Sequence, residues 1–368
     1  MGVMSGKVDS GAIEAKQKYL KLSSSYFRKG LGIAVLSGMF YGLYTAFITL
    51  AMSKGVWGDW YGENTALLSA FVITYMLAAL GAAVNDICSA LWATGIAAFK
   101  GKMGDFFRSI NTKPGHIMIF AALVGGPIAT TAYVAGLQLA GSIIIPISAL
   151  CPSIGAILSR ILFKQALSAR MMLGIGICFA ASFLIGWTSV VGGEAPERML
   201  LGIAIAFIAA FGWGLEGCIA GYGTSMIDYE IGITIRQATS GLANLLILVP
   251  LFALVAGNIG LASSLTVQAF TSGPAMIWFL VSGFCALFAF SLWYKGNSMC
   301  GTALGMAANG TYSFWGPFFA WIILGIIFGL EGWGMSPVAW VAAIMMAFGI
   351  LVIAMNPLDL FRKKERIS

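Results

Sequence analysis

A few ionisable side chains interrupt long apolar stretches of this sequence, and they are the first candidates for chemistry. Glu216 lies in the apolar run 199–220, three residues after Trp213, so the two side chains share one face of a helix. A charged group at the centre of a bilayer costs about 2.5–3.5 kcal/mol on insertion scales, and it therefore needs a partner or a use. We expect Glu216 either to bind and release a proton or to pair with a cationic group of a bound molecule. The alternative is a hydrogen-bonded glutamate that holds helices together.

The depths of two further ionisable residues are ambiguous. Asp86 lies near the end of one apolar run whose pattern continues to Ile96, so it either faces the interior of a long, tilted helix or marks the helix boundary. Arg236 lies about a turn and a half into another run, close enough for its side chain to reach the inner membrane surface. The alternative for Arg236 is a gate or an anion partner, with Asp228 or Glu230.

Aromatic, amide and proline residues occur in several runs where a lipid-facing helix would be apolar. Proline frees backbone carbonyls, and such groups hold ligands in many carriers. The candidate substrate-binding residues are Tyr41, Tyr44, Tyr133, Gln138, Trp213, Glu216, Asn309, Tyr312 and Trp315, and the candidate coupling or gating residues are Asp86, Glu216 and Arg236. The alternative for the aromatic and amide residues is packing and interhelical hydrogen bonding.

Long apolar runs must position these side chains. Ten runs each have roughly the 20 residues that a helix needs to cross a bilayer. They are residues 31–53, 66–87, 116–138, 142–163, 171–191, 199–220, 231–256, 275–294, 301–330 and 337–355. Because lipid cannot satisfy open backbone groups, the sequence predicts an all-α integral membrane bundle of ten transmembrane helices. Residues 11–22 are expected to form either a short basic surface helix or a disordered tail, and residues 257–273 only a connection.

Composition and charge placement exclude a soluble protein and predict an orientation. The chain is 59% hydrophobic and only 10% charged, and its mean hydropathy is +0.90. If the N-terminus is cytoplasmic, nineteen of the 21 lysines and arginines lie inside, and only Lys54 and Arg198 lie outside. This asymmetry predicts both termini in the cytoplasm, in a bacterial inner membrane, and it explains the net charge of +7 without a nucleic-acid partner.

Two internal matches indicate a repeat. Residues 39–45 resemble residues 211–217, and the two segments share a Gly-Leu pair that begins at Gly42 and Gly214. This match joins the first span with the sixth, and a second match joins the fourth span with the ninth, so each pairs a span with the span five positions later. Because five is odd, the second half must insert upside down, which predicts two inverted five-helix repeats around a cavity at the membrane midplane.

The second match lies in the fourth and ninth spans. Pro152 precedes Phe163 by eleven residues, and Pro317 precedes Phe328 by the same eleven.

The expected organisation is a cytoplasmic segment 1–30, a first repeat 31–191, an external linker 192–198, a second repeat 199–356 and a cytoplasmic basic tail 357–368.

The segment 152–164 (PSIGAILSRILFK), its counterpart 317–331 (PFFAWIILGIIFGLE), the ten spans and the five-plus-five halves together resemble the drug/metabolite transporter superfamily in its ten-helix EamA-like form. That superfamily typically has a proline, an apolar run and an apolar-Gly-Glu turn at this point. The second copy keeps Gly329 and Glu331, whereas the first has Lys164 in place of the acid. The resemblance covers nearly all of residues 30–356 and implies a secondary carrier. It does not identify the substrate.

These features favour a secondary active transporter that works by alternating access. If Glu216 binds and releases a proton, transport is coupled to protons. Several tyrosines and tryptophans around one acid suit an organic cation, an amine or an amino acid. A sugar or nucleoside carrier is the alternative, and a channel-like permeation protein is a different class. An enzyme is not expected, because the chain has one histidine. The expected partners are a small-molecule substrate, the bilayer and protons, without cofactor or metal, in a monomer or homodimer.

Overall fold

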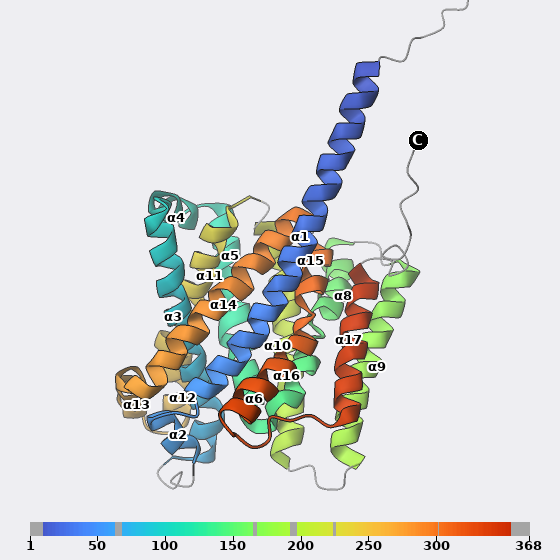
Figure 1. The fold of residues 1–368 in the computed structure, drawn as a ribbon. Coiled ribbons are helices and arrows are strands. Elements are labelled where there is room, and N and C mark those ends of the chain that lie inside the picture. The colour runs from blue at the N-terminus through green and yellow to red at the C-terminus, as the bar shows by residue number, and fades with distance from the viewer. Residues whose placement is uncertain are drawn as a thin grey trace, which may run out of the picture.

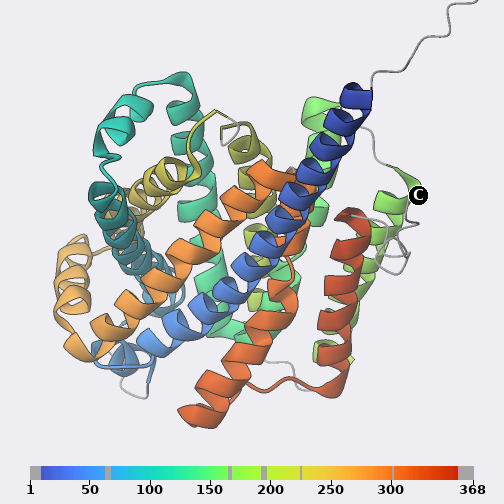
Figure 2. The same ribbon diagram turned by 45° about the horizontal axis from the view of Figure 1, so that its top comes forward.

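The structure is a computed structural model that describes residues 10–62, 68–164, 168–191, 197–223, 226–300 and 302–354, and all regular structure in these residues is helical (Figures 1 and 2). The expected linker 192–198 lies mostly outside the described residues, and the tail 357–368 lies entirely outside them. The α-helices are α1 Ser10–Ala51, α2 Val56–Tyr61, α3 Leu77–Phe99, α4 Met103–Ile110, α5 Lys113–Leu123, α6 Thr131–Ala140, α7 Ile144–Ser148, α8 Cys151–Phe163, α9 Ala169–Val191, α10 Glu197–Gly223, α11 Tyr229–Ala243, α12 Val249–Val255, α13 Gly260–Thr271, α14 Gly273–Cys300, α15 Thr302–Asn309, α16 Tyr312–Ala320 and α17 Pro337–Ala354.

Seven continuous helical stretches in the described residues are long and apolar enough to cross a membrane, which identifies an integral membrane protein. They are Arg28–Ala51, Val72–Phe99, Lys113–Ser148, Arg198–Gly221, Tyr229–Val255, Gly273–Cys300 and Gly305–Ile327. Three shorter apolar helices, Cys151–Leu162, Ala169–Leu184 and Pro337–Ile353, coincide with the fourth, fifth and tenth runs expected from the sequence. The all-helical membrane fold is therefore confirmed, with seven spans by length.

The outer surface of the bundle is apolar in the middle of these stretches. Large side chains such as Ile208 and Leu246 are exposed there. Contact between such a large apolar surface and water is unfavourable, whereas contact with the hydrocarbon of a bilayer is not.

Four π-helical turns interrupt the long helices: η2 Val72–Met76, η3 Val124–Thr130, η5 Asn244–Leu248 and η6 Trp321–Ile327. In η3 the cause is visible, because Pro127 lacks the N–H that an α-turn needs. Thr130 Oγ1 donates to the carbonyl oxygen of Gly125 at 2.9 Å and so satisfies a backbone acceptor of this turn. Each π-turn contains one extra residue, so the helix faces on its two sides follow different registers.

Helices from the two predicted halves pack against each other throughout the bundle. α1 runs along α14, α3 packs on α11, and α6 packs on α10. α9 and α17 form a pair at one edge of the molecule (Figures 1 and 2). We call the end of the bundle that carries α4 the α4 end and the opposite end, which carries α2, the α2 end (Figure 1).

Two local expectations need correction. Residues 11–22 are helical, but they are the first turns of α1, which extends beyond the bundle, and not a separate surface helix (Figure 1). Residues 257–273 do more than connect two spans, because most of them form helix α13 at the α2 end.

Candidate functional site

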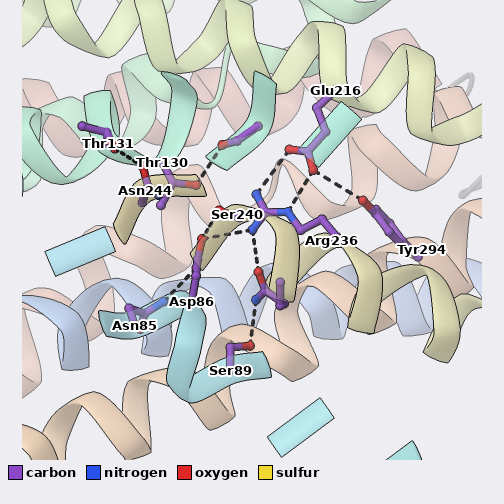
Figure 3. A network of polar contacts seen from close by, with 12 residues as sticks. Asn85, Asp86, Ser89, Thr130, Thr131, Glu216, Arg236, Ser240, Asn244 and Tyr294 are labelled. Atoms are coloured by element: carbon purple, nitrogen blue, oxygen red, sulfur yellow. Dashed lines mark hydrogen bonds and ion pairs between the residues drawn. The ribbon is translucent and has the colours of Figure 1, made fainter. Parts of the chain in front are cut away.

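A buried ion pair joins α10 and α11 in the interior of the bundle. Arg236 Nε donates to Glu216 Oε1 at 2.9 Å, and Arg236 Nη2 donates to Glu216 Oε2 at 3.4 Å (Figure 3). Tyr294 OH donates to the same Glu216 Oε1 at 3.4 Å. Neither Arg236 nor Glu216 has any exposed surface. The two planar groups therefore meet side by side, with the fork geometry that is typical of strong arginine–carboxylate pairs.

A second carboxylate, Asp86 of α3, lies on the other side of the guanidinium. Its Oδ2 is 3.6 Å from Arg236 Nη1, and it also accepts a hydrogen bond from Ser240 Oγ (Figure 3). Asn85 Nδ2 donates to Asp86 Oδ1 at 3.3 Å. We call Asp86, Glu216 and Arg236 the ion cluster. With all three groups ionised it has one net negative charge in a place that water does not reach.

Uncharged polar groups hold the ion cluster in position. Arg236 Nη1 donates to Gln237 Oε1 at 2.6 Å, and Gln237 Nε2 donates to Ser89 Oγ of α3 at 2.7 Å. Ser282 Oγ of α14 lies 2.7 Å from Asn85 Oδ1. Because buried ions are stable only when their other hydrogen-bonding capacity is used, this outer layer is part of the site.

The π-turn η3 presents bare backbone to the ion cluster. A Cβ atom at Gly125 would lie 1.9 Å from Glu216 Oε2, and a Cβ atom at Gly126 would lie 1.9 Å from Ser240 Oγ. No side chain larger than hydrogen fits at either position without displacing a member of the site. The Gly-Gly-Pro sequence therefore permits the close approach of α10 and α11 to this helix.

Six aromatic rings pack together beside the ion cluster. The ring of Tyr41 lies 4.2 Å from that of Tyr312, 5.3 Å from Tyr44, 5.6 Å from Trp213 and 5.8 Å from Tyr133, measured between centroids. We call these five residues together with Phe290 the aromatic cluster.

Phe290 connects the aromatic cluster with the ion cluster. Its ring centroid lies 4.0 Å from Arg236 Cζ, a cation–π contact, and 5.9 Å from the ring of Tyr41. Ser282 makes a second connection, because its Oγ also donates to the backbone oxygen of Tyr44 at 3.3 Å. The two clusters therefore form one continuous buried region.

Several polar atoms in the aromatic cluster have no protein partner. The hydroxyls of Tyr41 and Tyr44 and the indole N–H of Trp213 are buried and make no hydrogen bond. By contrast, the hydroxyls of Tyr133 and Thr45 lie 2.6 Å apart. A buried donor without a partner costs about 1–3 kcal/mol, so these three donors carry hydrogen-bonding capacity that the protein itself leaves unused.

The remaining candidate residues lie apart from these clusters. Asn309 Nδ2 donates to Ser37 Oγ at 2.8 Å, a bond between α15 and α1. The ring of Trp315 stacks with Phe319 at 6.1 Å. Gln138 lies at the α2 end, where its amide is 3.9 Å from the sulfur of Met52. The structure thus brings eight of the eleven candidate residues into one region and leaves these three outside it.

The expectation for Arg236 was wrong in its details. The side chain does not reach the membrane surface, and its partners are Glu216 and Asp86, not Asp228 or Glu230. The interior reading of Asp86 is the one the structure supports, so Glu216 is not a lone carboxylate. Residues missed by the sequence analysis include Gln237 and Ser240, although their spacing from Arg236, at i+1 and i+4, places all three on one side of the helix.

Metal ligation has no support in the part of the chain that the structure describes, where no three His, Cys, Asp or Glu side chains come together.

Comparisons with known proteins add the fold alone. No protein-family model and no curated protein matches the chain. A solved structure described as "Crystal structure of protein" aligns with a TM-score of 0.51, over 87% of this chain and 96% of that chain, at 15% sequence identity. At this identity the likeness concerns the arrangement of helices only.

Proposed function

We propose that the protein is a secondary active transporter of the drug/metabolite transporter type, which moves a small polar organic solute across a bacterial inner membrane by alternating access. Its ten apolar helices all cross the membrane, both termini are cytoplasmic, and two inverted five-helix halves move against each other around the ion and aromatic clusters. Glu216 and Asp86 bind the positive charge, proton or solute, that the cycle carries.

The observation that carries this proposal is that both halves build the buried site. Asp86 comes from the first half, whereas Glu216 and Arg236 come from the second. In the aromatic cluster, Tyr41 of the first half stacks on Tyr312 of the second. A relative movement of the halves must therefore change the site, which is the requirement for alternating access.

Close helix contacts support the inverted repeat. A Cβ atom at Gly42 would lie 2.7 Å from the backbone of Trp315, which joins the first and ninth predicted spans. A Cβ atom at Gly214 would lie 3.0 Å from the carbonyl oxygen of Cys151, which joins the sixth and fourth. Exchanging each span for its repeat partner, the first for the sixth and the ninth for the fourth, converts one contact into the other, so the glycines matched in sequence have equivalent packing roles.

The ends of the fourth and ninth spans support the same relation. Helix α8 ends at Phe163, and the next residue, Lys164, has a left-handed φ of 54°. In the ninth span, η6 ends at Ile327 and is capped by Phe328, and the next residue, Gly329, has a φ of 63°. Counted from the prolines, Lys164 and Gly329 both stand twelve residues on, so Lys164 matches the glycine and not the acid of the second copy. Only the second copy has the glycine that this conformation favours.

The charge of the ion cluster favours a cationic solute or a proton. One arginine faces two carboxylates, and binding one positive charge would neutralise the site. The aromatic faces suit the apolar part of an amine, a quaternary ammonium ion or an amino acid. A sugar or nucleoside is the second candidate, because aromatic faces and the unpartnered donors of Tyr41, Tyr44 and Trp213 also suit a hydroxylated ring.

Ligand screening followed by flux measurement tests the proposal. Purified protein is heated with amines, quaternary ammonium ions, amino acids, sugars and nucleosides, and a ligand that prefers the folded state raises the melting temperature. The solute that does so should show saturable uptake into liposomes that contain the protein. Glu216→Gln should lose this uptake while it remains folded, because it removes the negative charge but keeps an acceptor for Arg236. Flux that never saturates would indicate a channel, and full uptake by Glu216→Gln would exclude the coupling role.

A further inference from the structure

A tight turn between α3 and α4 places two lysines at the α4 end. Lys100 ends α3, Gly101 follows with a φ of 70°, and Lys102 precedes α4. The N–H of Lys102 donates to the oxygen of Ala97 at 2.8 Å, and that of Gly101 donates to the oxygen of Ala98 at 3.0 Å. This pair of bonds is the Schellman motif, which fixes the direction of the chain after a helix.

Two acids stand opposite, at the start of α11. Asp228 caps this helix, since its side chain accepts from the N–H of Glu230 at 2.9 Å, and Glu230 lies in the first turn. Acidic residues are favourable at this end of a helix because of the helix dipole. Both acids are therefore held in place by α11 itself.

Three ion pairs connect the lysines with the acids. Lys102 Nζ lies 2.6 Å from Glu230 Oε2 and 3.1 Å from Asp228 Oδ2, and Lys100 Nζ lies 2.5 Å from Glu230 Oε1. The hydrogen bond to Glu230 is the main reason why the pKa of Lys102 is raised. The lysines belong to the first predicted half and the acids to the second, so these pairs join the halves.

Two pockets lie at the opposite, α2 end. One, of about 290 Å³, is lined by Tyr61, Gln138 and Arg198 among others, and a second, of about 410 Å³, is lined by Gln138, Glu331 and Trp333 among others. The first is lined by residues of the first half and by Arg198 of the linker, whereas the second is lined by residues of both halves. The halves are thus joined by ion pairs at the α4 end, and a pocket lies between them at the α2 end.

We propose that Lys100, Lys102, Asp228 and Glu230 form an inner latch that keeps the α4 end closed while the α2 end is open. Opening toward the α4 end requires these ion pairs to break, because they span the boundary between the moving halves. The inference rests on the proposed function, in which the halves alternate.

Cysteine labelling measures the latch directly. Thr234 is buried in α11, one turn deeper than Glu230, and its hydroxyl donates to the backbone oxygen of Glu230 at 2.7 Å. Thr234→Cys is introduced and treated with a membrane-impermeant maleimide in inside-out and right-side-out vesicles, and peptide mass spectrometry separates it from the native cysteines. Labelling in inside-out vesicles should be slow with the intact latch.

Charge reversal should open the latch, and a charge swap should close it again. Lys100→Glu with Lys102→Glu, or Glu230→Lys alone, should speed the labelling about threefold to tenfold, since a few surface ion pairs contribute about 1 kcal/mol together. Combining all three changes restores two pairs of opposite charge, and labelling should slow again. The matched control is Arg108→Gln, which breaks the ion pair of Arg108 with Asp105 inside α4 and should leave the rate unchanged.

Equal labelling rates in all variants would overturn the latch, and so would a charge swap that labels as fast as the reversals. Labelling needs no substrate, so this result is separate from the test of transport. A latch that responds in a protein without uptake would refute the proposed function alone, whereas saturable uptake with no change in labelling would refute the latch alone.

Discussion

Replacing Arg236 by glutamine should destabilise the protein more than any other single change in the ion cluster. The change removes the only cation of the cluster, with its bond of 2.9 Å to Glu216 and its contact of 4.0 Å with Phe290. Two buried carboxylates are then left facing each other. Breaking a buried pair by removal of one partner costs about 3–5 kcal/mol, and we expect a loss of this size in the free energy of unfolding.

Glu216→Gln gives the opposite expectation from the same geometry. It leaves Asp86 and Arg236, one charge of each sign, and the new amide oxygen can still accept from Arg236 Nε. The loss should stay below about 1 kcal/mol, the ordinary value of one weakened hydrogen bond. A triple variant, Asp86→Asn with Glu216→Gln and Arg236→Gln, contains no charge and should regain most of the stability lost in Arg236→Gln.

Unfolding by SDS in mixed micelles, with heat denaturation as a second measurement, compares these variants. The reasoning is refuted if Arg236→Gln is as stable as the wild type, or if Glu216→Gln loses as much as Arg236→Gln. A triple variant less stable than Arg236→Gln would show that hydrogen-bond geometry, and not charge, dominates the cluster.

Three further changes test other parts of the structure. Gly125→Ala places a Cβ atom 1.9 Å from the carboxylate of Glu216 and should cost about 1–3 kcal/mol of unfolding free energy, whereas Gly95→Ala, with nothing within 4 Å, should be neutral or stabilising. Tyr41→Phe removes an unpartnered hydroxyl, so the melting temperature should not fall. The KM for the solute should rise, because the solute loses a hydrogen-bond partner. An unchanged KM would show that Tyr41 does not bind the solute. Lys164→Gly relieves a left-handed φ of 54° and should raise the unfolding free energy by about 1 kcal/mol, and a decrease would contradict the strain.

The helical membrane fold was predictable because bilayer thickness and backbone hydrogen bonding leave few options for apolar runs of this length. The interior position of Glu216 was predictable for the same reason. The partner of Glu216 was not. Arg236 is twenty residues away on the next helix, and its depth depends on how far α11 extends beyond the membrane surface.

The aromatic cluster shows a second limit. Tyr41 and Tyr44 share a helix face by spacing alone, but Tyr133, Trp213 and Tyr312 come from three other spans. Their meeting depends on which helices are neighbours. The proposed repeat relates spans in pairs, yet it does not say how closely they pack.

The extra residue in η3 has a mechanical consequence. Because one residue corresponds to a rotation of about 100° about a helix axis, shifting the wide turn along the chain would rotate the residues that it passes by a step of about that size, while the helix on either side keeps its orientation. Such a shift exchanges a few neighbouring carbonyl partners and leaves the rest of the ladder intact. Thr131 and Tyr133 follow the turn, so they would swing away from Asn244 and Thr45, their hydrogen-bond partners, without any unfolding of the span. The span can therefore turn locally at η3 without losing its helical structure.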